Sequence, residues 1–291
     1  MGLFVSESLR ALFDDSVRIL TEAGVENPAE DVKILLAAVL GIRRQEVFLH
    51  FAENVGLTEK QRLTFAEYIK QRAEHKPVSR ILGSRGFWSL DFVLNEETLD
   101  PRPDSETLVQ AVLENTKPDE FFTILDLGTG TGCLPLAILA ERPKARTVGV
   151  DISKQAVEAA RENAKRNVLA DRADFICADW NDFANEIKEK FDIVISNPPY
   201  IPSRDVDFLD DEVKKYDPLR ALDGGADGLD CYRQIAKILP LLLKENGDFF
   251  CEVGMGQAKA VSDIFENNGM KVKQIYKDLA GIERVLFMKN K

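Results

Sequence analysis

Between residues 121 and 200 the sequence alternates between two kinds of apolar pattern. Short runs rich in β-branched and aromatic residues are typical of strands, and longer runs with apolar residues three or four positions apart are typical of helices. The strand-like runs are FFTILDLG, RTVGVD, ADFICADW and FDIVISNPPY, and the helix-like runs between the first three are residues 133–142 and SKQAVEAARENAKRN. This alternation predicts an α/β fold with a doubly wound, mostly parallel sheet.

The chain after residue 200 continues this pattern. It predicts helices at 228–244 and 256–268 around the strand GDFFCEVG, followed by the strands MKVKQIYKD and RVLFMK, which are joined through Gly281. The segment TLVQAVLEN, which precedes the first strand of the sheet, is typical of a helix. We therefore expect the sheet to belong to a domain over residues 105–291.

Residues 1–75 have a different pattern, in which apolar residues recur at helical spacing. The apolar positions of the first two helices are Leu9, Leu12, Phe13, Ile19 and Leu20, then Val32, Leu35, Leu36 and Val39. Asn27 and Pro28 give the second helix an N-cap and a proline at its first position, and Thr58 caps a third helix. We expect a small helical substrate-recognition domain here, joined to the sheet by a hairpin linker over residues 76–104.

Composition excludes several classes of protein. No run of about 18 apolar residues is present, so we expect no membrane span. The start, MGLFVSESLR, lacks the basic and apolar segments of a secretory signal, and we interpret its match to the myristoylation pattern at Gly2 and Ser6 as coincidence. The four cysteines include no C-x-x-C pair and lie far from the two histidines. This arrangement argues against a disulfide framework and a metal site, and favours a cytoplasmic protein.

The chain is acidic, with a formal net charge of −11. Such a charge opposes non-specific binding to nucleic acid, whose phosphates it repels. We therefore expect a protein partner, no direct contact with nucleic acid or membrane, and a monomer.

Three glycines follow the first predicted strand of the sheet, in DLGTGTG. Gly128, Gly130 and Gly132 allow a tight turn and a close backbone approach to a ligand, and the N-terminus of the next helix favours a negatively charged group. The spacing differs from the dinucleotide fingerprint G-x-G-x-x-G, so a plain tight turn is the alternative. Asp151 ends the second strand, where a carboxylate can accept hydrogen bonds from ribose hydroxyls, and Trp180 ends the third, where an indole could flank adenine.

The fourth strand ends in Asn197, Pro198, Pro199 and Tyr200. Each proline fixes φ and removes an N–H, so the segment is rigid and rich in acceptors. Asn197 adds a side-chain carbonyl and Tyr200 a flat face, which suit a planar NH2 group such as an amide or a base amine. A proline-terminated strand with a core tyrosine is the alternative. Because ligands bind at the carboxyl ends of strands in open α/β sheets, we expect this segment and the glycine loop to form one site.

This combination resembles the class I S-adenosylmethionine-dependent methyltransferases that methylate planar nitrogens. The segments PVSRILGSRGFWSLDF, PRPDSETLV, DLGTGTG, GVDIS, ADW, SNPPYIP, LDGGADGLDCYR and CEVG resemble the HemK/PrmC family over nearly the whole chain. The resemblance implies a seven-stranded sheet, S-adenosyl-L-methionine as cofactor, and class-1 peptide chain release factors as partners. It also implies methylation of the side-chain N5 of the glutamine in their Gly-Gly-Gln motif, which modulates translation termination.

The resemblance assigns roles to residues of this chain. It implies cofactor contacts at Gly128, Thr129, Gly130, Thr131, Gly132, Asp151, Trp180 and Asn197. It implies substrate contacts at Asn197, Pro198, Pro199 and Tyr200. We hypothesise that the Asn197 side-chain oxygen and the Pro198 carbonyl accept the two amide hydrogens, and that Tyr200 packs on the amide plane, so that these three are the catalytic residues. No metal is implied.

Two positions depart from the family pattern. Asp100 precedes Pro-Arg-Pro where an aliphatic residue is usual, and Pro135 lies in the first helical turn after the glycines, where proline is tolerated. Other residues have structural interpretations. Asp126 could hydrogen-bond the glycine loop or touch the ligand, whereas the rest are interpreted as packing or turn residues: Cys133, Phe87, Trp88, Gly224 and Gly225.

Three other functions remain open at this point. A nucleic-acid amino-methyltransferase would use the same acceptors on a base amine, but the acidic composition argues against it. A catalytically silent cofactor-binding protein would not need the complete motif set. A sister enzyme that acts on a glutamine of a ribosomal protein is the third, and the segments FWSL and PRPDSE favour the release-factor branch over it.

Overall fold

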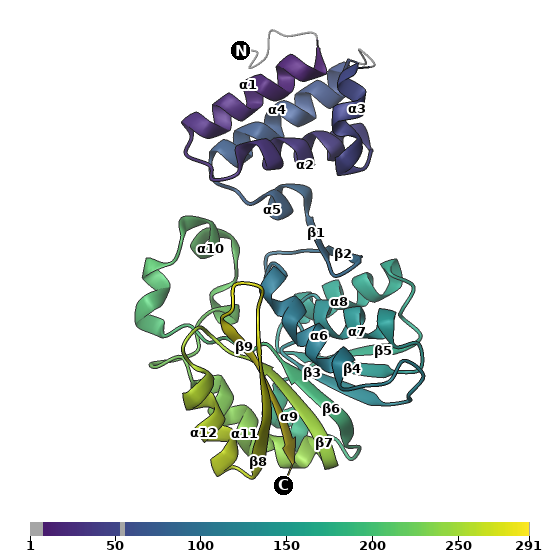
Figure 1. Ribbon diagram of the computed structural model, residues 1–291, viewed down its shortest axis with the longest axis vertical. Coiled ribbons are helices and arrows are strands. Elements are labelled where there is room, and N and C mark those ends of the chain that lie inside the picture. The colour runs from purple at the N-terminus through teal and green to yellow at the C-terminus, as the bar shows by residue number, and fades with distance from the viewer. Residues whose placement is uncertain (1–7, 53–55, 291) are drawn as a thin grey trace. The chain divides into compact units, whose positions relative to one another are not determined.

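The computed structural model describes residues 8–52 and 56–290. Gly2 and Ser6, which carry the myristoylation pattern, lie outside the described residues. The chain divides into two compact units, Met1–Gly83 and Ser84–Lys291, which are coloured along the sequence in Figure 1. Among the described residues, every helix is too short or too polar to cross a lipid bilayer.

The first unit is helical and has its own apolar core. Its elements are α1 (Leu9–Glu22), α2 (Pro28–Leu40), η1 (Arg44–Glu46), α3 (Val47–Ala52), α4 (Glu59–Ala73) and α5 (Val78–Leu82). Thr58 caps α4 as expected, in a capping box with Gln61, whereas the side chain of Asn27 makes no capping hydrogen bond to α2. The sequence pattern did not predict α3 and α5, because helices of five or six residues are too short to show a helical period.

The linker expected over residues 76–104 does not form a separate segment, because the boundary between the two units falls after Gly83. Gly83 ends α5 in the left-handed conformation with a φ of 68°. Beyond it, β1 (Ser84–Phe87) and β2 (Leu90–Val93) pair as an antiparallel hairpin. Asp100, one of the two departures from the family pattern, is buried and lies 3.7 Å from Arg85 of β1. A carboxylate is accommodated at this position because the guanidinium of Arg85 lies close enough to balance its charge.

The second unit is built on a seven-stranded sheet. Its strands are β3 (Thr123–Leu127), β4 (Arg146–Asp151), β5 (Ala173–Cys177), β6 (Phe191–Ser196), β7 (Leu243–Glu252), β8 (Met270–Lys277) and β9 (Glu283–Asn290). Their order is β5-β4-β3-β6-β7-β9-β8, and all pairs are parallel except those of β9. This is the doubly wound, mostly parallel sheet that the sequence predicted, with the seven strands that the resemblance implied.

Helices cover both faces of the sheet (Figure 1). One face packs against α6 (Glu106–Glu114), α7 (Cys133–Glu141) and α8 (Lys154–Arg166). The other packs against α9 (Trp180–Glu186), α11 (Asp230–Leu242) and α12 (Ala258–Asn267). Pro135 is buried in the first turn of α7, where its missing N–H leaves no intrahelical bond unmade.

One local prediction needs correction. Trp180 does not end a strand but begins α9, because Asp179 caps that helix through its hydrogen bond from Asn181 N. Between β6 and α11 the chain forms short helical segments that the sequence pattern did not predict. They are η3 (Ser203–Phe208), α10 (Asp211–Tyr216) and η4 (Leu219–Ala221), and η2 (Pro103–Ser105) likewise precedes α6.

Candidate active site

The glycine loop joins β3 to α7. Gly128, Gly130 and Gly132 have φ angles of 79°, 54° and 77°, a backbone region that only glycine adopts at little cost. The amides of Gly128 and Thr129 both donate to the carbonyl of Val150 on β4, at 2.9 and 3.0 Å. The loop therefore needs its glycines for its shape and is anchored on the neighbouring strand.

Asp151, at the end of β4, holds the same loop through its carboxylate. Its Oδ2 accepts from the amide of Gly130 at 2.8 Å, and its Oδ1 accepts from the amide of Ser153 at 2.9 Å. Burial raises the pKa of Asp151, and these backbone hydrogen bonds oppose the shift. Each oxygen keeps a second lone pair, so the carboxylate can still accept from a ligand hydroxyl.

Trp180 lies against the other side of the loop. A Cβ on Gly128 would lie 3.7 Å from its six-membered ring, and its indole N–H donates to Oε1 of Gln234 on α11 at 3.2 Å. This hydrogen bond and the capped start of α9 fix the orientation of the ring, which is a condition for stacking against a flat ligand.

Asn197 follows β6 directly and meets a residue from a distant part of the sequence. Its Nδ2 donates to Oγ of Ser105 at 3.1 Å, and Ser105 ends η2. Because the NH2 group is committed in this way, the Oδ1 of Asn197 remains as an acceptor. The hydrogen bond of Ser196 Oγ to the carbonyl of Leu127, at 2.8 Å, ties the same point of β6 to the start of the glycine loop.

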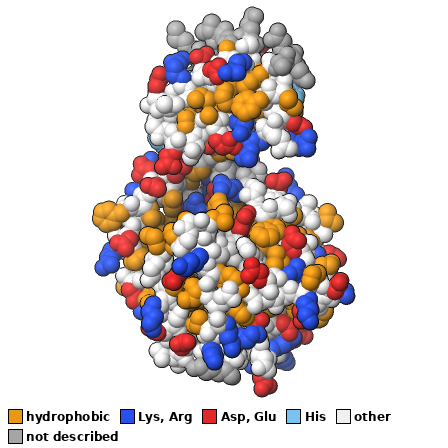
Figure 2. All heavy atoms as spheres, in the orientation of Figure 1, with side chains coloured by type: hydrophobic (Ala, Val, Ile, Leu, Met, Phe, Trp, Pro, Cys, Tyr) orange, Lys and Arg blue, Asp and Glu red, His pale blue; other side chains and the backbone are white. Residues whose placement is uncertain are grey.

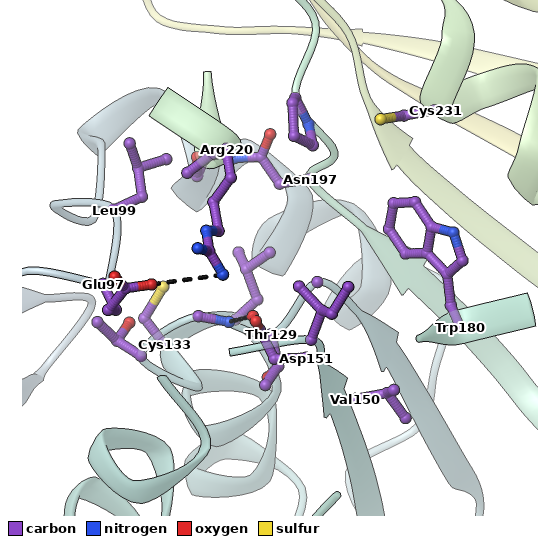
Figure 3. A pocket seen from close by; sticks show the side chains of 18 of the residues that line it. Glu97, Leu99, Thr129, Cys133, Val150, Asp151, Trp180, Asn197, Arg220 and Cys231 are labelled. Carbon is purple, nitrogen blue, oxygen red and sulfur yellow. Dashed lines mark hydrogen bonds and ion pairs between the residues drawn. The ribbon is translucent and has the colours of Figure 1, made fainter. Parts of the chain in front are cut away.

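These features line one cavity of about 250 Å³ (Figure 3). Of the residues predicted from the sequence, those that line it are Gly128, Thr129, Gly130, Thr131, Asp151, Trp180, Asn197 and Pro199. Gly132, Pro198 and Tyr200 are not among its lining residues. Gly132 precedes α7, Pro198 is buried, and Tyr200 is mostly buried, which raises the pKa of its phenol to about 12.

The segment Asn197–Tyr200 is supported from outside the motif. A Cβ on Gly224 would lie 2.7 Å from the carbonyl oxygen of Pro199 and 2.8 Å from Cα of Tyr200. The carbonyl of Tyr200 accepts from Nε2 of Gln257 at 2.9 Å. The interpretation of Gly224 as a simple turn residue was therefore incomplete, because only glycine fits where this loop meets the backbone of the motif.

Sequence analysis missed part of the lining. Glu97 and Arg220 form an ion pair of 3.5 Å at the cavity (Figure 3). Cys133 also lines the cavity, and burial raises the pKa of its thiol to about 12, so that the thiol stays protonated and unreactive. No short pattern marks Glu97 or Arg220 in the sequence, because Glu97 lies in a turn and Arg220 in the three-residue segment η4.

The charge of the lining is unbalanced. Its carboxylates are Glu97, Asp151, Asp179 and Asp223, and its guanidinium groups are Arg102 and Arg220. An excess of carboxylates favours a ligand that carries positive charge. Within the described parts of the chain, no three His, Cys, Asp or Glu side chains are arranged to hold a metal ion.

Asp126 lies in β3 just before the glycine loop and does not line the cavity. Its side chain is 1% exposed. Burial raises the pKa of the carboxyl to about 7, and the nearby side chain of Thr129 opposes this shift. Of the two interpretations of Asp126 that the sequence left open, this position favours the one in which it contacts the loop.

The fold and the cavity define a class I methyltransferase, a class whose methyl donor is S-adenosyl-L-methionine. The methyltransferase small domain family matches residues 86–209, and the PrmC N-terminal domain family matches residues 11–83. A methyltransferase of known structure from Pyrococcus furiosus has a TM-score of 0.50 and 15% identity, over 70% of this chain and 90% of that one. SMU.776, a putative methyltransferase solved in complex with SAH, has a TM-score of 0.50 and 14% identity, over 69% of this chain and 53% of that one.

The chain belongs to the release factor glutamine methyltransferase family. The release factor glutamine methyltransferase of Rhodospirillum rubrum is 45% identical to it over 286 residues, which are 97% of this chain and 85% of that protein. The resemblance to the HemK/PrmC family that the sequence motifs indicated is therefore confirmed.

The buried carboxyl of Asp126 predicts a pH-dependent stability. Its pKa is raised from 3.8 to about 7 in the folded protein, so the stability that it contributes is complete below its unfolded pKa and is lost as the pH rises through about 7. Asp126→Asn should therefore raise the free energy of unfolding by about 2–4 kcal/mol at about pH 8. The gain should vanish near pH 4, as measured by urea unfolding.

Asp174→Asn is the matched control, because it removes an exposed carboxylate of β5. A gain from Asp126→Asn that is equally large at both pH values would contradict the assignment of a raised pKa to Asp126.

Proposed function

We propose that this chain transfers a methyl group from S-adenosyl-L-methionine to the side-chain N5 of the glutamine in the Gly-Gly-Gln motif of class-1 peptide chain release factors, and so modulates translation termination. The placement of Asn197 carries this proposal. Its side chain lines the same cavity as Gly128 and Asp151, with its NH2 group committed to Ser105. The name of the relative from Rhodospirillum rubrum supports the choice of a release factor as substrate.

The residues present fit S-adenosyl-L-methionine. Asp151 would accept hydrogen bonds from the ribose hydroxyls, Trp180 would flank the adenine, and the loop 128–132 would lie against the amino-acid part. The excess of carboxylates in the lining suits the positive charge of the cofactor. When bound, the cofactor supplies an electrophilic methyl group on a sulfonium sulfur.

The chain's task is to present an amide nitrogen, which is a weak nucleophile because its lone pair is delocalised into the carbonyl. Asn197 Oδ1 and the Pro198 carbonyl would each accept one N–H of the substrate amide and hold the nitrogen toward the methyl donor. Such orientation removes much of the entropic barrier. Acceptors that are fixed before the reaction also stabilise the positive charge that develops on the nitrogen.

The rigidity of the motif supports this mechanism. Pro198 and Pro199 have fixed φ angles, and the contacts of Gly224 and Gln257 hold the backbone of Pro199 and Tyr200 in place. The phenol of Tyr200, whose pKa is about 12, stays neutral. It would therefore offer an uncharged face to the amide plane.

A direct test incubates the purified chain with S-adenosyl-L-methionine and a class-1 release factor. Peptide mass spectrometry should find one added methyl group on the glutamine of the Gly-Gly-Gln motif. A factor in which alanine replaces that glutamine is the control. Labelled transfer to nucleic acid or to a ribosomal protein, with none to the release factor, would contradict the proposal.

The acceptor role of Asn197 predicts a loss of turnover in Asn197→Ala. The barrier should rise by about 2–4 kcal/mol, the usual effect of removing one oriented polar group from a transition-state site. Asn197→Asp keeps an acceptor and should lose less. Turnover at saturating cofactor and release factor measures both effects, and near-normal turnover of the alanine variant would rule out the acceptor mechanism.

The ribose contact of Asp151 predicts weaker cofactor binding in Asp151→Ala. Loss of a hydrogen bond to a charged group costs about 1.5–3 kcal/mol, which is roughly a 10- to 150-fold rise in the dissociation constant. Calorimetry with S-adenosyl-L-methionine measures this change. Asp174→Ala removes an equal charge from the exposed side of β5 and should bind normally, and an unchanged affinity of Asp151→Ala would refute the contact.

We also propose that the helical unit recognises the release factor. A glutamine side chain is small and common, so discrimination must come from contacts far from the reacting nitrogen. Hydrophobic side chains are exposed at the surface of the molecule (Figure 2), and on the helical unit those of Leu49 and Leu63 are 65% and 68% exposed. Exposed apolar side chains of this kind are suited to a protein contact.

Removal of residues 1–83 should therefore leave cofactor affinity intact and reduce methylation of the full-length factor steeply. A short Gly-Gly-Gln peptide should be a poor substrate for both forms. Leu49→Ser in the intact chain provides a variant that keeps the unit folded, and circular dichroism checks both proteins. If a folded truncation methylates the factor as fast as the intact chain, the helical unit is not the recognition element.

A further inference from the structure

Glu252 occupies a position that the mechanism above does not use. It ends β7, the strand that lies beside β6 in the sheet. Ser196 and Cys251 are register partners on these parallel strands, so the next residue on each, Asn197 and Glu252, stands at the same level of the sheet. Because side chains alternate between the faces of a sheet, these two side chains lie on the same side.

The carboxyl of Glu252 lies behind the wall of the cavity. Its side chain is 1% exposed, and the residue is not among those that line the cavity. The nearby side chains of Ser105 and Asn197 lower its pKa, but burial is the larger effect and raises the pKa to about 7. Its Oε2 has no hydrogen-bond partner among the described residues.

A buried carboxyl with an unsatisfied oxygen destabilises a fold. A glutamine or an apolar residue at the end of β7 would avoid this cost. The position therefore calls for an explanation other than packing, and Ser105 and Asn197 are among the neighbours of the carboxyl.

We propose that Glu252 is a positioning residue for methyl transfer, whose buried carboxyl holds the hydroxyl of Ser105 and the NH2 group of Asn197 so that Asn197 Oδ1 faces the substrate amide. This inference rests on the proposed function. Asn197 Nδ2 donates to Ser105 Oγ, and the hydroxyl hydrogen of Ser105 is then available for an acceptor, which Glu252 supplies. When the carboxyl of Glu252 accepts from both Ser105 and Asn197, the amide of Asn197 cannot flip and present its NH2 group to the substrate.

The carboxyl also strengthens the acceptor. A negative charge behind the NH2 group of Asn197 polarises the amide and shifts electron density toward Oδ1, since hydrogen bonds in a chain reinforce one another in a low dielectric. The ionised form of Glu252 does this better than the neutral form. Turnover should therefore fall as the pH drops through the pKa of Glu252.

Several other groups face this carboxyl and share its electrostatics. Arg284 on β9 lowers its pKa and Asp104 on η2 raises it. The groups whose own pKa values respond to Glu252, besides Arg284, are Tyr200 after β6, Tyr232 on α11, Cys251 on β7 and Cys133 on α7. Arg284 is itself paired with Asp278 at 3.0 Å and with Asp104 at 3.1 Å, so its charge is largely neutralised before it reaches Glu252.

The test compares Glu252→Gln with the wild-type chain over pH. The variant keeps the shape of the side chain but carries no charge. At about pH 8 we expect kcat to fall roughly 10- to 100-fold, the equivalent of one hydrogen bond to a charged group, with the KM for release factor and the Kd for cofactor changed by less than about twofold. The acidic limb of the wild-type kcat profile, near the pKa of about 7, should disappear.

The thermal stability of Glu252→Gln at about pH 8 should change in the opposite direction to its turnover. Because the folded-state pKa of Glu252 is raised, the wild-type chain loses stability as the pH rises through about 7, and Glu252→Gln does not. The variant should therefore melt at a higher temperature than the wild type at about pH 8 and at a similar temperature near pH 4. Cys251→Ala is the matched control, because it alters the neighbouring buried residue of β7 and leaves Glu252, Ser105 and Asn197 intact.

The side-chain amide of Asn197 gives a readout that does not depend on turnover. Its ¹⁵N–¹H signals, assigned through Asn197→Ala, should move as the pH passes through about 7 in the wild type and in Cys251→Ala, but not in Glu252→Gln. A wild-type chain that methylates no release factor would refute the proposed function, and the signals would still decide the role of Glu252. The positioning role is overturned if Glu252→Gln keeps full kcat, if it melts at a lower temperature than the wild type at about pH 8, or if the Asn197 signals are unchanged by pH in the wild type.

Discussion

The parallel register of β3 with β4 and β6 is the constraint on which the site depends. Leu127 pairs with Val150 on one side and with Ser196 on the other, so the glycine loop, Asp151 and Asn197 all leave the sheet at the same level. A shift of the register by one residue would turn each of these side chains to the opposite face. The buried apolar side chains on both faces of the sheet prevent such a shift, and the core of the second unit thereby fixes the distance between the cofactor side and the acceptor side of the cavity.

Most of this arrangement could be predicted from the sequence, because it depends on local patterns. The alternation of strands and helices defines the sheet, and open α/β sheets bind ligands at the carboxyl ends of their strands. The short helical segments between β6 and α11 could not be predicted in the same way. η3, α10 and η4 each span six residues or fewer, and segments of that length take their conformation from tertiary contacts rather than from a period in the sequence.

The residues that support the site could not be identified from the sequence, for a related reason. Ser105, Gly224 and Glu252 meet the motif Asn197–Tyr200 only in three dimensions, from η2, from the loop before α11 and from the end of β7. A motif in the sequence shows which groups could touch a ligand, whereas the groups that hold those side chains in place can come from any element. Their identification requires the register of β6 and β7 and the packing of η2 against the sheet.

Two buried acidic residues near the site, Asp126 and Glu252, lower the stability of the core. Each is 1% exposed, and burial raises the pKa of each carboxyl to about 7. Asp126 lies beneath the loop proposed to hold the cofactor, and Glu252 lies behind the side chain proposed to hold the substrate. Near neutral pH, half-ionised carboxyls at these points destabilise the fold but supply charge where water is excluded and its effect is strongest. A sheet with a large apolar core on both faces can tolerate that loss, and this explains why the two carboxyls lie in the central strands β3 and β7, beside the residues that they support, and not at the sheet's edge.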